Sequence, residues 1–117
     1  MSSNFKDLIA WQLSHTYTVE VYRHFNGCRD FSFKEQIQRA AISGMNNIAE
    51  GCGRTSDKAF INFLQIAKAS IIETQSMLIL AVSLQYISDE NCQTMLNKSD
   101  ELLKVISGLI RKLRAKD

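Results

Sequence analysis

The chain has 117 residues, of which 45% are apolar and 22% charged, with five glycines and no proline. This length suits one domain with a single hydrophobic core, and the composition excludes a disordered chain and favours a helical, soluble protein. The formal net charge is only +2. Because the chain is not a polycation, any nucleic-acid binding must come from a local basic patch or from several assembled copies.

The cysteines and the hydropathy pattern indicate where the protein works. Cys28, Cys52 and Cys92 are scattered along the chain, without the close CxxC spacing of a zinc site. No secretory signal pattern and no apolar run of roughly 18 residues is visible. We therefore expect a cytoplasmic protein with reduced thiols, no bound metal and no membrane contact.

Helix start signals divide the chain into four segments. Ser32 and Glu35 have the spacing of a capping box, so the second segment is expected to begin at Phe33. Ser56 and Ser88 are the expected caps of the third and fourth segments. We predict one domain over residues 1–117, with helices at about 8–25, 33–51, 57–85 and 89–114.

The fold class follows from the periodicity and from the short loops. No segment alternates with period two over the length of a strand, and short loops make consecutive helices antiparallel neighbours. The sequence therefore predicts an all-α, antiparallel up-down-up-down four-helix bundle. The third helix is apolar on most sides, and Glu73 lies on one line with Ile66, Met77, Leu80 and Leu84. Since a lone bundle leaves each helix one wet face, we expect a homo-oligomer.

A stripe of polar side chains runs along the second helix. It includes Arg39, Ser43, Asn47 and Glu50, and together with Glu73 these are the candidate helix or subunit contacts. A solvated face is the simpler interpretation of such a stripe. The alternative is a close helix contact, because Ser and Asn are poor interior helix formers that carry hydrogen-bonding groups close to the backbone.

Cationic residues are predicted to gather at one end of the bundle. The start of the first helix, the loop after the second and the end of the fourth meet there in an up-down bundle. The candidate nucleic-acid-binding residues are Lys6, Arg54, Lys58, Arg111, Lys112, Arg114 and Lys116. A solvated helix end is an equally simple explanation, since cations favour helix C-termini. In a ring of copies, however, the same excess becomes a basic rim for phosphates, with salt-sensitive and largely sequence-independent binding.

No catalytic constellation is visible in the sequence. His15 and His24 lie roughly 180° apart around the first helix and cannot share a ligand. The Glu-x-x-His pairs of di-iron bundles are missing, and the Gly-Cys-Gly-Arg loop lacks the lysine and spacing of a phosphate-binding loop. We expect no enzymatic activity, no catalytic residue and no cofactor.

Several segments carry a family resemblance: FKDLIAWQ, QIQRAAIS, NNIAEGCGR, SDKAFINFLQIAKAS and LILAVSLQYI. Together they resemble the four-helix bundle protein family that includes the 23S rRNA intervening-sequence proteins, and NIAEG followed by Gly-Arg and Ser-x-Lys-x-Phe is the specific part. The resemblance implies a homopentamer with no known enzymatic activity. A relative in diversity-generating retroelements is a nucleic-acid-binding accessory subunit of a reverse transcriptase, which implies RNA, DNA or a nucleic-acid enzyme as the partner.

The chain also departs from the family pattern. Gly44-Met45-Asn46 stands where Ile-Pro-Ser is usual, which removes a kink-forming proline; Ala59 and Gln75 replace acidic residues, and Ala69 replaces a glycine. Two functions therefore stay open. One is a nucleic-acid-binding accessory protein that uses the basic end, and the other is a protein-interaction scaffold with no nucleic-acid role.

Overall fold

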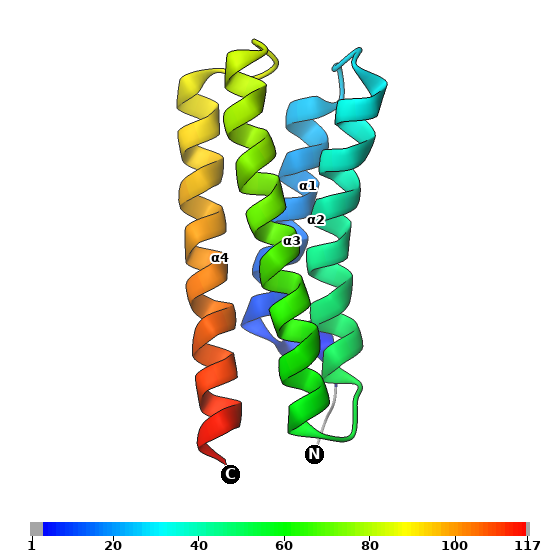
Figure 1. Ribbon diagram of the computed structural model, residues 1–117, viewed down its shortest axis with the longest axis vertical. Helices are drawn as coiled ribbons and strands as arrows, with labels where there is room; N and C mark the ends of the chain where they lie inside the picture. Colours follow the sequence, from blue (N-terminus) through cyan, green and yellow to red (C-terminus); the bar gives the residue numbers. More distant parts are fainter. Residues whose placement is uncertain (1–3, 117) are drawn as a thin grey trace.

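The computed structural model describes residues 4–116, and these form a short 3-10 helix followed by four α-helices. Their bounds are η1 Phe5–Asp7, α1 Ile9–Phe25, α2 Phe31–Cys52, α3 Asp57–Ser83 and α4 Asp89–Ala115. Consecutive helices pack side by side and run in alternating directions (Figure 1). The bundle measures 47 × 21 × 19 Å. The predicted all-α, up-down fold is therefore confirmed for the described residues.

Side-chain caps set the helix starts. Ser56 and Ser88 cap α3 and α4 as predicted, each accepting the backbone N–H three residues further on, at 3.1 and 3.0 Å. The start of α2 differs from the prediction. Asp30, rather than Ser32, is its cap, because the Asp30 carboxylate accepts the backbone N–H of Phe33 at 3.1 Å. A carboxylate at this position also suits the positive end of the helix dipole, so α2 begins one half-turn earlier than predicted.

The most extensive helix contact joins α2 and α3, and it depends on glycine. A Cβ on Gly51 would lie only 2.6 Å from Cβ of Phe63. On Gly44, two turns earlier, a Cβ would lie 3.1 Å from Cγ1 of Ile71. Helix α2 runs without a break through Gly44-Met45-Asn46. The departure from the family pattern at these residues therefore leaves a continuous helix that approaches α3 closely.

A buried polar group links α1, α3 and α4. The hydroxyls of Tyr17 and Thr74 lie 2.7 Å apart, and burial raises the pKa of Tyr17 to about 12. Nε2 of Gln75 donates to the buried Ser99 hydroxyl at 2.7 Å and to Asp100 Oδ1 at 2.8 Å. Gln75 stands where the family resemblance implies an acid, and it joins α3 to α4 through donor groups that an ionised acid lacks.

Helix α3 is apolar beyond what the core uses. Of the helices in the described residues, α3 alone has the length and the apolar composition that would allow it to cross a membrane. A core helix of a soluble bundle has the same character, and Leu64, Ala67 and Ile71 are indeed buried in the core. Apolar side chains of α3 and of its C-cap Leu84 are nevertheless 43% to 58% exposed: Ile66, Ile72, Ile79, Leu80 and Leu84. Met77, which the sequence places on the line of Glu73, is instead buried in the core. The single chain thus leaves apolar surface uncovered.

Candidate nucleic-acid interface

Two of the three elements predicted to carry the cationic end lie at one end of the bundle. The α2–α3 loop and the end of α4 are at the lower end in Figure 1, whereas η1 and the start of α1 lie higher, beside α2. Nζ of Lys116 lies 3.5 Å from Oδ2 of Asp57, which puts the last turn of α4 beside the first turn of α3. Asp117, which follows, lies outside the described residues.

Two of the seven candidate cations already have partners. Nη2 of Arg54 donates to Oε1 of Glu50 at 2.8 Å, and its guanidinium lies over the Phe63 ring, 4.7 Å from the centroid. Lys116 pairs with Asp57. The other candidates are exposed and form no ion pair within residues 4–116: Lys6, Lys58, Arg111, Lys112 and Arg114. Arg54 therefore supports the α2–α3 contact, and much of the free charge lies on α4.

A cationic groove runs between α3 and α4 next to this end. We call it the α3–α4 groove; it consists of two adjoining hollows of about 320 and 240 Å³. Its polar lining residues are Gln65, Lys68, Lys104, Ser107, Arg111 and Arg114. Of the described residues, no Asp or Glu lines either hollow, and none forms an ion pair with the four cations. The groove therefore presents uncompensated positive charge.

Half of the groove's cations are outside the set predicted from the sequence. Arg111 and Arg114 belong to that set, whereas Lys68 and Lys104 do not. A signal for Lys104 exists in the sequence, because Lys104, Ser107, Arg111 and Arg114 are spaced so that they lie on one face of a helix. Lys68 has no such signal, since only the packing of α3 against α4 brings it to the same groove.

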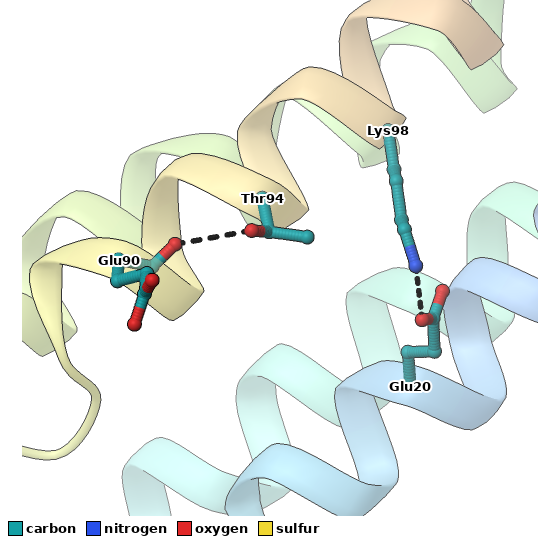
Figure 2. Close-up of polar contacts among 4 residues, drawn as sticks. All are labelled: Glu20, Glu90, Thr94 and Lys98. Carbon is teal, nitrogen blue, oxygen red and sulfur yellow. Dashed lines mark hydrogen bonds and ion pairs between the residues drawn. The ribbon is translucent and has the colours of Figure 1, made fainter.

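The other side of α4 has a different character. A hollow of about 150 Å³ there, the α1–α4 seam, is lined by Leu13, Thr16, Tyr17, Glu20, Lys98 and Glu101. Lys98 donates to Oε2 of Glu20 across the gap between the helices (Figure 2). One turn earlier on α4, the Thr94 hydroxyl donates to the Glu90 carbonyl at 3.2 Å (Figure 2). Because Glu20 and Glu101 face a single lysine, this seam does not favour an anion.

The short side chains of the α2 stripe lie at the α2–α3 contact. The hydroxyls of Ser43 and Ser70 lie 2.9 Å apart across the two helices. Nδ2 of Asn47 donates to the Ser43 carbonyl at 2.8 Å and to its hydroxyl at 3.2 Å. All three residues are partly buried. Their polar groups are thus satisfied where the helices approach each other.

The charged members of the same candidate set lie at the surface of the single chain. Arg39 pairs with Glu35 within α2 at 3.5 Å, and Glu50 also has its partner within α2. Glu73 is exposed on α3 and accepts a hydrogen bond from Gln36 of α2 at 3.4 Å. Exposed ion pairs of this kind contribute little stability. Their positions are compatible with a solvated face or with a contact to another copy.

Titratable groups with shifted pKa values lie away from the groove. The hydroxyl of Tyr86 donates to Asp30 at 2.8 Å; this bond, with the backbone N–H of Phe33, lowers the pKa of Asp30, and it raises the pKa of Tyr86. Burial raises the pKa of the Cys52 and Cys92 thiols, which lowers their thiolate fraction. Among the described residues, no three His, Cys, Asp or Glu side chains are grouped to hold a metal ion.

The fold and its glycine-dependent α2–α3 contact define a small helical-bundle protein. Residues 6–108 match the model of the 23S rRNA-intervening sequence protein family, and the chain belongs to this family. The chain is also similar to a solved structure from Bacteroides thetaiotaomicron, a protein with unknown function from the S23 ribosomal protein family, at 29% identity. The TM-score is 0.81, over 87% of this chain and 98% of that chain. No curated protein matches the chain.

Proposed function

We propose that this protein is a non-enzymatic, homo-oligomeric accessory protein that binds RNA or DNA without a cofactor. The observation that carries the proposal is the row of unpaired cations at the α3–α4 groove and the adjoining end. From Lys104 to Arg114 this row extends about 15 Å along α4, at 1.5 Å per residue. A polyanion with regularly spaced phosphates is a suitable ligand for such a row, because each contact releases counterions.

Assembly into a ring would repeat this row in every copy. The exposed line of Ile66, Leu80 and Leu84 on α3, which also contains Glu73, supports a contact with a second copy. The family resemblance supports a homopentamer. Ile66, Glu73, Leu80 and Leu84 do not line the α3–α4 groove, so a contact along this line need not cover the groove.

The proposed partners are further copies of the chain, RNA or DNA, and a nucleic-acid enzyme; no membrane partner is proposed. The name of the family, which refers to a 23S rRNA intervening sequence, supports RNA as one partner class. Cys28 and Cys92 are free thiols, as is usual in the cytoplasm, which is the proposed location.

Nucleic-acid binding is tested by a salt series with short RNA and DNA oligonucleotides of unrelated sequence. We expect binding that weakens as salt rises from about 50 to 200 mM. Replacing Arg111, Lys112 and Arg114 together by Ala should weaken binding to every sequence and lower the salt slope by about 0.7 to 0.9 for each lost phosphate contact. The fold should survive, because Arg111, Lys112 and Arg114 are exposed. Failure of the parent protein to bind either nucleic acid at low salt would refute the proposal.

A protein-interaction scaffold with no nucleic-acid role is the second candidate. The exposed apolar side chains of α3 favour it, since they suit a protein partner as well as a second copy. The same salt series separates the two functions. A protein that stays oligomeric but ignores RNA and DNA at low salt would be assigned as a scaffold.

A further inference from the structure

We infer that the α3–α4 groove holds one single strand of nucleic acid, with phosphates on its cationic walls and a sugar or base against its apolar upper part. The inference rests on the proposed function and adds the class of strand and the place where it lies. It concerns the groove itself, including Lys68 and Lys104, rather than the helix ends alone.

Both walls of the groove supply cations. Lys68 projects from α3, and Lys104 and Arg111 project from α4; all three line the larger hollow, with Lys68 and Arg111 shared by the smaller one. Ser107 lies between the cations of α4 and also lines both hollows. A phosphate in the groove can therefore accept hydrogen bonds from both helices and from a hydroxyl, whereas a phosphate on a flat helix face meets one wall only.

The larger hollow, which forms the upper part of the groove, combines this charge with apolar surface. Ile72, which is 51% exposed, and Leu103, which is partly buried, line it beside Lys68 and Lys104. In a duplex the base faces are stacked inside and cannot cover such a patch. A single strand can turn a base or a sugar toward it while its phosphates stay on the walls. Apolar surface next to unpaired cations thus favours an unpaired strand.

The lining of the groove also bears on sequence preference. No aromatic side chain lines either hollow among the described residues. Without a stacking platform or a base-reading side chain pair, the groove should accept most sequences.

The test measures fluorescence anisotropy of a labelled single-stranded RNA, the same sequence as single-stranded DNA, and the corresponding duplexes. Four proteins are compared at one salt concentration: the parent, Lys68→Gln/Lys104→Gln, Ile72→Ser, and the control Arg23→Gln/Arg29→Gln. The control removes two exposed cations near the opposite end of the bundle, so its net charge equals that of the groove variant. Thermal melting checks that each variant is folded.

We expect the parent to bind both single strands more tightly than either duplex. The Lys68→Gln/Lys104→Gln variant should lose about tenfold or more in single-strand affinity, as expected for loss of charge-assisted hydrogen bonds, while the control loses clearly less. Ile72→Ser should weaken binding of the single strands and leave duplex binding unchanged. Equal parental affinity for strand and duplex, or equal losses in the groove and control variants, overturns the groove assignment while the proposed function stands. If the parent binds none of the oligonucleotides, both fail.

Discussion

Helix α3 has two edges of opposite character. Toward α2 it is closely packed: Gly51 leaves no space for a Cβ beside Phe63, and Ser43 and Ser70 pair across the contact. Toward α4 its lower half opens into a groove, where Lys68 lies among cations that have no ion-pair partner within residues 4–116. One edge of α3 is therefore closely packed against the glycines of α2, and the other edge lines an open, positively charged groove.

This difference separates stability from binding. Close packing stabilises the first edge, so a methyl group added there against an atom that cannot move should be costly. Unpaired surface charge contributes little to folding but strongly to the attraction of a polyanion. Changes at the α2 edge should therefore alter unfolding and leave the groove intact, and changes at the α4 edge should do the reverse.

The largest expected effect on stability is that of Gly51→Ala. We expect the free energy of unfolding to fall by about 1 to 3 kcal/mol, because Cβ of Phe63 is fixed to the backbone and the two helices must move apart. Gly44→Ala is the matched control on the same helix face. There the nearest atom is Cγ1 of Ile71 at 3.1 Å, so this side chain has to shift by only a few tenths of an ångström; because Ala also favours the helix by about 1 kcal/mol, the change should be clearly smaller than at Gly51. Urea unfolding measures both; equal stability of the two variants would contradict the close contact at Gly51.

A smaller effect is expected for Glu73→Ala, on the outer line of the same helix. If this line packs against a second copy, the substitution should change stability or assembly by more than about 1 kcal/mol, whereas an exposed site stays within about 0.5. Melting and sedimentation equilibrium measure the two quantities, with the exposed Glu35→Ala as control. If the melting temperature and the mass are unchanged, Glu73 and the polar stripe of α2 belong to a solvated face and not to a subunit contact.

The smallest expected effect is on how stability depends on pH. It arises outside both edges of α3, at the hydrogen bond between Asp30 and Tyr86. The Tyr86 hydrogen bond lowers the folded-state pKa of Asp30, so Asp30 contributes stability above the ordinary carboxyl pKa of 3.8 and loses it as the pH falls through the lowered value. Tyr86→Phe should reduce this loss on the acid side. The stabilities of the two proteins, measured by acid unfolding with circular dichroism, should therefore converge at low pH. A constant difference in stability at all pH values would contradict the role of the Asp30–Tyr86 bond.

The sequence was sufficient for the features that depend on local signals. Ser56 and Ser88 precede apolar periodic segments, and both cap their helices as predicted. Asp30, rather than the predicted Ser32, caps α2, because its carboxylate is the stronger acceptor. The family resemblance, based on NIAEG and the segments around it, is confirmed by the family match over residues 6–108. Gly51 of this motif lies at the α2–α3 contact.

The groove could be predicted only in part. Arg111 and Arg114 were identified because antiparallel topology carries the end of α4 to the cationic end. Lys68 was not, since its relation to α4 depends on the rotation of α3 about its own axis, which periodicity leaves open when a helix is apolar on most sides. The position of Arg54 over the Phe63 ring was equally hidden, because it depends on how the loop after α2 packs on α3. Its pairing with Glu50 did have a signal, the i, i+4 spacing.

The most direct measurement moves charge from one side of α4 to the other without changing the total. Glu101 lines the α1–α4 seam and Lys104 lines the α3–α4 groove, and both are exposed. The exchange Glu101→Lys/Lys104→Glu keeps the net charge and the helix propensity and only transfers positive charge away from the groove. Nucleic-acid binding at the groove predicts that the exchanged protein melts like the parent, binds single-stranded RNA about tenfold or more weakly at low salt, and has a salt slope lower by about one. Parental affinity and slope in the exchanged protein would show that net charge alone attracts RNA, and would contradict a binding site in the α3–α4 groove.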